Sequence, residues 1–182
     1  MTDEVLFLDS LDRKSDKTEK PWVVYALHTQ NPLWRSKTYS TYIGASNDHD
    51  RRLRQHNGEI AKGAKKTIKK RPWKKIFVVS SFATEVYALQ FEWKWNNQKK
   101  KYWNRTKEAD MPFGTQVKDR CQRLVWMFGR ERVVQKAPKL HSQTYTVQCA
   151  LSEKEFCSHI SMPISELRLK HPHVTYVFDV VF

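Results

Sequence analysis

Two apolar runs in the first quarter of the chain have the composition of β-strands. Residues 22–29 read WVVYALHT and residues 36–44 read SKTYSTYIG, and both are rich in residue types that favour a pleated sheet. The stretch NPLWR between them has the composition of a loop. The pattern predicts two antiparallel strands.

A short helix is expected after the second strand. Capping residue types at Ser46 and Asn47 precede two aspartates, and the segment closes with basic residues and an Asn-Gly pair. Acidic residues favour the first turn of a helix, whereas basic residues and glycine favour its end. These signals predict a helix from about residue 47 to residue 57. Residues 59–75 are rich in lysine with almost no acid, and they predict an exposed basic loop or a frayed helix.

A third strand and a second helix follow the basic segment. Residues 76–82, IFVVSSF, have the composition of a strand, and Thr84 and Glu85 provide capping signals for a helix that reads VYALQFEWKWN. The order is therefore β-β-α-β-α. We expect an α+β fold in which helices flank a small antiparallel three-stranded sheet.

The rest of the chain is expected to form a helical and mixed extension. A helix from Thr115 has apolar residues at the spacing of one helix face, namely Val117, Cys121, Leu124, Val125 and Phe128. Beyond Pro138, YTVQCAL and VTYVFDVVF predict strands, and ISELRLK predicts a short helix after Pro163. The expected division is a tail and linker at residues 1–20, a main domain at 21–100 and the extension at 101–182.

Charge and cysteine usage narrow the class of protein. The 182 residues carry a formal net charge of +14, which attracts polyanions and favours nucleic acid as the partner. The apolar runs are only a few residues long, so no membrane span is expected. The N-terminus has acidic residues where a signal peptide has basic ones, and the three cysteines show no pairing pattern, which predicts free thiols. We expect an intracellular protein, in the nucleus or another compartment that contains DNA, that is not secreted.

Glu92 lies in the most apolar part of the helix predicted after Thr84. Its helical neighbours include Ala88, Leu89 and Trp95, so the carboxylate is expected to be partly buried. A buried carboxylate without a partner costs several kcal/mol, roughly, so an arginine, a lysine or a metal ion should meet it. The alternative is a salt bridge to a neighbouring lysine on a solvated edge.

Arg52 and His56 are four residues apart and share one face of the predicted helix. A guanidinium matches two phosphate oxygens, and an imidazole can donate to a third oxygen or move a proton near neutral pH. The alternative is a solvated basic face. Tyr25 and Tyr42 fall in the two predicted strands, where tyrosines also serve simply as packing residues.

The order of these motifs resembles the GIY-YIG endonuclease superfamily. Its first motif corresponds to Val23-Val24-Tyr25, with Val23 where the family usually has glycine, and its second to Tyr42-Ile43-Gly44. The strings HNG, KGAKKT, RPW, FVV and FEWKW resemble the nuclease domain of Slx-type catalytic subunits of structure-specific endonucleases. The resemblance covers about residues 22–96 and implies that residues 21–100 form a GIY-YIG nuclease domain.

The resemblance implies a role for each candidate catalytic residue. Tyr25 would activate the attacking water or relay its proton, and the nearby cations are expected to favour its phenolate. Tyr42 would hydrogen-bond near the scissile phosphate or help to order the water. Arg52 would hold that phosphate and stabilise charge in the transition state, and His56 would assist proton transfer. Glu92 would bind one divalent ion, Mg²⁺ or Mn²⁺, that polarises the phosphate and stabilises the leaving oxygen. The implied reaction is phosphodiester hydrolysis.

Basic residues around these motifs are expected to bind DNA. The candidates are Arg51, Arg54, Lys62, Lys65, Lys66, Lys69, Lys70, Arg71 and Lys94. Backbone contacts predict steep salt dependence and recognition by shape, which suits branched or flapped DNA. Aromatic residues could stack on unpaired bases or pack in the core, namely Trp73, Trp93, Trp95, Tyr102 and Trp103.

The extension departs from the Slx-type pattern. Those subunits have a zinc-binding RING-like domain, whereas here Cys149, Cys157 and His159 have no structural zinc spacing, and zinc is not expected. His171-Pro172-His173 is too short to be interpreted as a ligand pair without a partner. In that family this half also docks a scaffold protein, and such a partner remains open here.

The leading hypothesis is a metal-dependent, structure-selective DNA endonuclease that acts on repair, recombination or replication intermediates. Two alternatives remain. One is a homing or restriction-like GIY-YIG nuclease that reads a sequence, and the other is a nucleic-acid-binding protein whose nuclease site has decayed.

Overall fold

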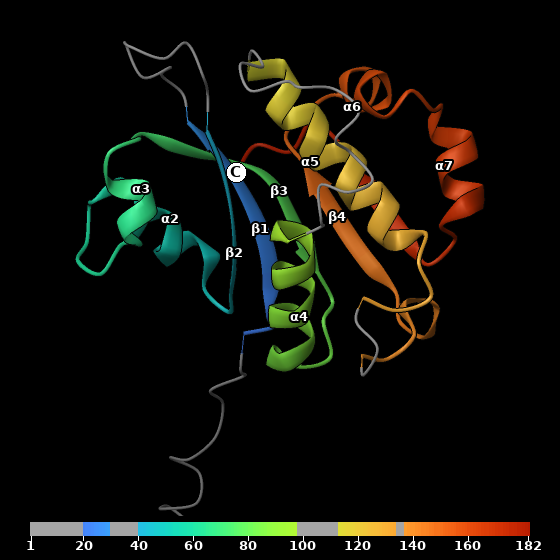
Figure 1. The fold of residues 1–182 in the computed structure, drawn as a ribbon, viewed down its shortest axis with the longest axis horizontal. Helices are drawn as coiled ribbons and strands as arrows, with labels where there is room; N and C mark the ends of the chain where they lie inside the picture. The colour runs from blue at the N-terminus through green and yellow to red at the C-terminus, as the bar shows by residue number, and fades with distance from the viewer. Residues whose placement is uncertain (1–19, 30–39, 98–112, 134–136) are drawn as a thin grey trace, which may run out of the picture.

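A five-stranded sheet forms the centre of the molecule (Figure 1). The computed structural model describes residues 20–29, 40–97, 113–133 and 137–182. The strand order is β2-β1-β3-β4-β5, so β2 is an edge strand. The strands are β1 (Val23–Thr29), β2 (Thr41–Ser46), β3 (Trp73–Ser80), β4 (Tyr145–Cys149) and β5 (Val174–Val177).

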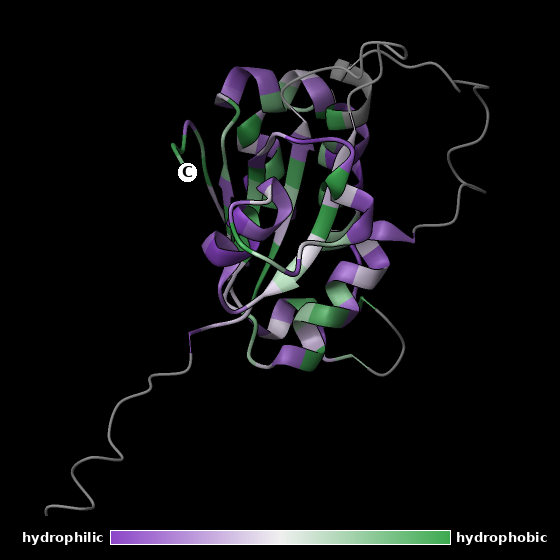
Figure 2. Ribbon diagram, turned by 90° about the vertical axis from the view of Figure 1, so that its left-hand side faces the viewer, coloured by the Kyte–Doolittle hydropathy of each residue, from purple (hydrophilic) through white to green (hydrophobic). Residues whose placement is uncertain are grey.

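Helices cover both faces of the sheet. Figure 1 shows α2 and α3 near the β2 edge, with the other helices over the remainder of the sheet. Figure 2 shows the molecule from the α2 and α3 side, with hydrophobic residues along the strands and many hydrophilic residues on the helices. The helices are α2 (His49–Asn57), α3 (Lys65–Ile68), α4 (Glu85–Asn96), α5 (Phe113–Phe128), α6 (Glu153–Ile160) and α7 (Ile164–Lys170), with a 3₁₀ turn η2 (Leu140–Ser142). None of the described helices is long and apolar enough to span a bilayer.

The alternation of side chains along β1 separates two hydrophobic clusters. Val24 and Ala26 belong to the large cluster that includes residues of α4, α5, α6 and α7. Tyr25 and its neighbours Val23 and Leu27 point to the opposite face, where Leu53 of α2 packs. Since successive side chains of a strand face opposite sides of a sheet, the functional candidate Tyr25 lies on the α2 side.

The predicted α+β fold and the order β-β-α-β-α are confirmed. The first strand lies where it was predicted, and the helix after the second strand begins at His49, with Asp48 as its N-cap. The side chain of Asp48 accepts a hydrogen bond from the backbone nitrogen of Arg51 at 3.0 Å. The second strand is described over Thr41–Ser46, and the earlier part of its predicted range lies outside the described residues.

The basic segment is more ordered than predicted. It contains the short helix α3, and β3 begins at Trp73, three residues before its predicted start. Lys75 is buried and its Nζ pairs with Asp50, so the prediction of an exposed segment is wrong at this residue. The reason is a pairing partner that lies 25 residues earlier in the sequence.

Two further strands extend the three-stranded sheet that was predicted. β4 pairs antiparallel with β3, and β5 pairs parallel with β4. The extension therefore shares one sheet with the first half of the chain, and the domain boundary near residue 100 stays a prediction. The helix α5 was predicted from Thr115 and begins at Phe113.

One helix of the extension was missed from the sequence. Helix α6 begins with a capping box in which the side chains and backbones of Ser152 and Glu155 bond reciprocally. The S-x-x-E spacing was a usable signal. The helix at Ile164–Lys170 was predicted, and the three cysteines are free thiols, also as predicted.

Candidate active site

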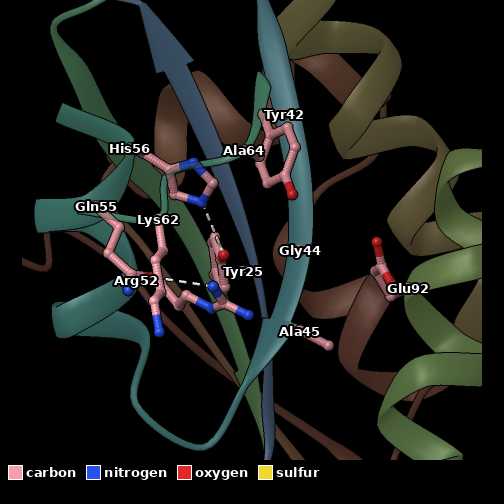
Figure 3. Close-up of a pocket in the computed structure, with 10 residues that line it drawn as sticks. All are labelled: Tyr25, Tyr42, Gly44, Ala45, Arg52, Gln55, His56, Lys62, Ala64 and Glu92. Carbon is pink, nitrogen blue, oxygen red and sulfur yellow. Dashed lines mark hydrogen bonds between the residues drawn. The ribbon is translucent and has the colours of Figure 1, made fainter. Parts of the chain in front are cut away.

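All five candidate catalytic residues line one pocket (Figure 3). The cavity has a volume of about 210 Å³ and lies where α2 and α4 approach the edge strand β2 from opposite sides. Its lining residues are Tyr25, Tyr42, Gly44, Ala45, Arg52, Gln55, His56, Lys62, Ala64 and Glu92. Residues up to 67 positions apart in sequence therefore meet at one place.

Gly44 of β2 leaves space through which Tyr25 of the neighbouring strand β1 reaches this pocket. The two residues are partners in the β1–β2 register. A Cβ added to Gly44 would lie 2.6 Å from the Tyr25 hydroxyl, which is closer than such atoms can approach. The absence of a side chain at Gly44 thus leaves space for the phenol. The ring of Tyr42 lies nearby on the edge strand, with its centroid 6.5 Å from that of Tyr25.

A hydrogen-bonded chain connects Tyr25 to the buried end of α2. The Tyr25 hydroxyl lies 3.0 Å from His56 Nε2, and His56 Nδ1 lies 3.0 Å from Thr67 Oγ1. Thr67 donates its hydroxyl proton to the Ala64 carbonyl at 2.7 Å. The Thr67 oxygen must therefore accept a hydrogen bond from His56 Nδ1, so Nε2 has a free lone pair and the Tyr25 hydroxyl donates a hydrogen bond to it. Thr67 was not identified from the sequence.

Burial controls the protonation of both groups. It raises the pKa of Tyr25 well above its ordinary value; Tyr42 adds to the rise and Arg52 opposes it. Burial also lowers the pKa of His56 to about 4, with smaller contributions from Arg52 and Arg71. The expectation that cations would favour the Tyr25 phenolate is wrong for these described residues, because desolvation outweighs Arg52. The pair is a neutral phenol that donates to a neutral imidazole.

Arg52 extends from α2 toward the pocket beside this pair. Its Nη1 donates to Gln55 Oε1 at 2.9 Å, and Gln55 is itself buried. Figure 3 shows Arg52, Gln55 and Lys62 on the α2 side of β2. The hydrogen bond between Arg52 and Gln55 follows from their i, i+3 spacing and could have been predicted.

The C-terminal end of α2 is held by residues of the basic segment. The side chain of Asn57 bonds both the nitrogen and the carbonyl oxygen of Trp73, at 2.7 and 3.1 Å. Arg71 Nε donates to the His56 carbonyl at 2.6 Å, and Gly58 ends the helix in the left-handed conformation. Arg71 was predicted to bind DNA, and the geometry gives it a structural role in holding His56.

Glu92 approaches the pocket from α4, on the other side of β2 (Figure 3). It is partly buried, as predicted, and burial raises its pKa. Its Oε1 accepts a hydrogen bond from Asn96 Nδ2 at 3.3 Å. No salt bridge to Glu92 occurs among the described residues, so the alternative of an ion pair with a neighbouring lysine is not observed there.

These surroundings fit one divalent ion rather than a cage of protein ligands. Glu92 is the one carboxylate among the lining residues of this pocket, and the described parts of the chain contain no cluster of three or more metal-ligating side chains. Mg²⁺ typically keeps several waters and combines one or two carboxylates with phosphate oxygens of the substrate. Glu92 is a half-buried carboxylate that has no cationic partner among the described residues and faces a polar pocket, which suits that pattern.

Most of the predicted DNA-binding side chains are exposed. Exposed members are Arg51, Arg54, Lys62, Lys65, Lys66, Lys69 and Arg71, while Lys70 and Lys94 are partly buried. Lys62 lines the pocket itself, and Lys70 Nζ donates to Ser40 Oγ.

The aromatic candidates for base stacking divide into buried and exposed residues. Trp73 and Trp95 are buried, so the core-packing alternative holds for them, whereas Trp93 is 57% exposed. Tyr102 and Trp103 lie outside the described residues.

Comparisons with known proteins find similarity to nucleases. The sequence profile of the GIY-YIG catalytic domain matches residues 21–107. The structure-specific endonuclease subunit slx1 of Schizosaccharomyces japonicus is 52% identical over 63 residues, which cover 35% of this chain and 23% of that protein. The corresponding subunit of Schizosaccharomyces pombe is 53% identical over 58 residues, covering 32% and 21%. That of Cryptococcus neoformans is 41% identical over 71 residues, covering 39% and 15%. The chain thus matches less than a quarter of the length of these relatives.

Proposed function

We propose that the protein is an endonuclease that hydrolyses phosphodiester bonds in branched or flapped DNA, because the sequence profile of the GIY-YIG catalytic domain matches residues 21–107. One observation supports this most strongly: Tyr25, Tyr42, Arg52, His56 and Glu92, from four different elements, line a single pocket. The alternative of separate packing and surface roles would not require these side chains to converge.

Tyr25 and His56 form the path for the proton of the attacking water. A phenol with a raised pKa is a weak base while it keeps its own proton. Tyr25 donates to the lone pair of His56 Nε2, so its proton moves to His56 as the phenol oxygen accepts the proton of the water. Thr67 keeps the lone pair on Nε2 by accepting from Nδ1. The path requires a neutral His56, and the lowered pKa of this residue keeps it neutral near pH 7.

Arg52 and Tyr42 act on the phosphate. The guanidinium of Arg52 is anchored through one nitrogen by Gln55, so its remaining donors can hold nonbridging phosphate oxygens as charge develops on them. Tyr42 faces the same pocket and donates to a phosphate oxygen or orders the water.

Glu92 would hold one Mg²⁺ or Mn²⁺ ion. When bound, such an ion polarises the phosphate and stabilises the leaving oxygen. Glu92 faces Arg52 across β2 (Figure 3), so these two side chains would meet a bound phosphate from opposite sides.

The exposed lysines and arginines on α2 and α3 support binding to the DNA backbone. Contacts of this kind fix register and orientation but do not read sequence. The names of the similar proteins, structure-specific endonuclease subunits, support branched DNA as the substrate and a second protein as a partner. A nuclease that acts on repair or recombination intermediates would be located where such DNA occurs, which in eukaryotes is the nucleus.

The direct test is cleavage of end-labelled DNA by the purified protein. Flapped, branched and plain duplex substrates are incubated with Mg²⁺, with Mn²⁺ or with EDTA. Glu92→Gln and Arg52→Ala are compared with Arg168→Gln, a matched loss of positive charge on the exposed surface of α7. We expect metal-dependent cutting near the branch point by the wild type and by R168Q, and losses of at least about 100-fold in E92Q and R52A.

Other outcomes would contradict the proposal. Cutting of plain duplex at one fixed sequence would favour a sequence-reading nuclease. Tight binding to every substrate without any cutting would favour a decayed site. Equal cutting by E92Q and the wild type would remove Glu92 from the mechanism.

A further inference from the structure

Arg120 is a partly buried cation of α5. Burial lowers its pKa to about 10, so the guanidinium still keeps its charge near neutral pH. Removing a charged side chain from water is costly unless a partner of opposite charge or several hydrogen bonds replace the water. The partners of the Arg120 guanidinium therefore decide whether its charge is compensated within the protein.

Two hydrogen bonds place Arg120 beside the candidate active site. Its Nε donates to Thr41 Oγ1 at 2.9 Å, and Thr41 directly precedes Tyr42. Its backbone carbonyl accepts from Trp95 Nε1 at 3.3 Å, and Trp95 is one helical turn beyond Glu92. Arg120 is thus fixed to the two elements, β2 and α4, that bring Tyr42 and Glu92 into the pocket.

The charge of Arg120 has no acidic partner within the described residues. The neighbouring carboxylate, Asp119, accepts from Arg123 Nε at 2.8 Å instead. The structure shows no hydrogen bond for the terminal nitrogens Nη1 and Nη2 of Arg120 among the described residues. A guanidinium in this state presents a planar pair of donors, the arrangement that matches two oxygens of a phosphate.

We propose that Arg120 binds a backbone phosphate of the DNA strand that passes through the active site, adjacent to the scissile phosphate. This inference rests on the proposed function, because DNA supplies the anion. Each strand of a duplex presents a phosphate about every 3.4 Å along the axis, so a strand held between Tyr42 and Glu92 presents further phosphates on either side. The site gives the C-terminal extension a part in substrate binding.

The experiment measures binding of a fluorescent flap DNA over a range of salt concentrations in EDTA, where no cutting occurs. The proteins are the wild type, Arg120→Gln, Arg120→Lys and the matched control Arg168→Gln. We expect R120Q to bind about tenfold more weakly, and the slope of log affinity against log salt to fall by about one. R120K keeps the charge but loses the planar pair of guanidinium donors. Its salt slope should therefore be closer to that of the wild type than its affinity is. R168Q should match the wild type.

A structural role for Arg120 gives a different result. If Arg120 only anchors Thr41, then R120Q and Thr41→Val will lower the thermal midpoint by similar amounts, and the salt slope of R120Q will equal that of R168Q. That outcome overturns the inference about Arg120. The proposed function is tested separately, and it stands if the wild type cuts flap DNA. A wild-type protein that neither cuts nor binds flap DNA refutes the proposed function itself.

Discussion

Gly44 lies directly opposite Tyr25 in the β1–β2 pairing, and a Cβ at residue 44 would come within 2.6 Å of the Tyr25 hydroxyl. The backbone of Gly44 needs no unusual conformation, so the requirement for glycine is purely one of space. The position of the phenol in the pocket therefore depends on the missing side chain of its neighbour.

We expect Gly44→Ala to reduce the cleavage rate at least about tenfold, because the added methyl group displaces Tyr25 and a misplaced catalytic group is costly. Single-turnover cleavage of flap DNA measures the effect. Gly129→Ala is the matched control, since a Cβ there meets its nearest neighbour at an ordinary 3.5 Å. A rate for G44A equal to that of G129A would contradict the role of this contact.

Thr67→Val should impair catalysis without removing any group from the pocket. The change removes the oxygen that accepts from His56 Nδ1, so the imidazole can change tautomer and lose the lone pair that faces Tyr25. We expect a fall of about tenfold or more in kcat with little change in KM, and recovery in Thr67→Ser. Similar activity in T67V and the wild type would show that the tautomer of His56 is not critical.

The stability of the fold should fall at acid pH because of buried histidines. Burial lowers the pKa of both His56 and His171 to about 4, below the ordinary value of about 6.5 that applies in the unfolded chain. The unfolded state therefore binds more protons between these values, and the free energy of unfolding decreases as pH falls from about 6.5 to about 4. Above pH 6.5 this contribution is fully present.

Urea unfolding at pH 7, 5.5 and 4.5 measures this decrease. His171→Gln should weaken the dependence on pH, because it removes one of the histidines that take up a proton on unfolding. A free energy of unfolding that stays constant over this range, or an unchanged slope in H171Q, would contradict the role of the buried histidines in the pH dependence of stability.

The pair formed by Lys75 and Asp50 should respond unequally to its two possible truncations. The Lys75 side chain is 2% exposed, whereas that of Asp50 is 77% exposed. Asp50→Asn leaves a buried ammonium without its carboxylate, and we expect a loss of about 3 kcal/mol in the free energy of unfolding. Lys75→Met leaves a solvated aspartate and an apolar core residue, so the loss should be smaller. Chemical denaturation of both variants measures the difference, and a larger loss in K75M would contradict the dependence of the buried Lys75 ammonium on Asp50.

The sequence predicted the elements whose signals are local. The capping threonine at Thr84 and the strand at residues 23–29 were identified because each depends on neighbouring residues alone. The resemblance then connected Tyr25, Tyr42, Arg52, His56 and Glu92, which the structure brings to one pocket.

Features that depend on distant contacts were not predictable in this way. The burial of Lys75 needs Asp50, and the pKa of Tyr25 depends on how completely neighbouring elements exclude water. The role of Thr67 needs the position of α3 against α2, and the pairing of β4 with β3 joins segments about 70 residues apart.

The most direct measurement is the single-turnover rate constant for cleavage of pre-bound flap DNA by Tyr25→Phe. This variant removes one oxygen and keeps the ring that packs under Gly44. We expect the rate constant to fall by about 10²–10⁴-fold while the dissociation constant for DNA measured in EDTA stays unchanged. Cleavage by Y25F at the wild-type rate would contradict the assignment of this pocket as the centre of phosphodiester hydrolysis.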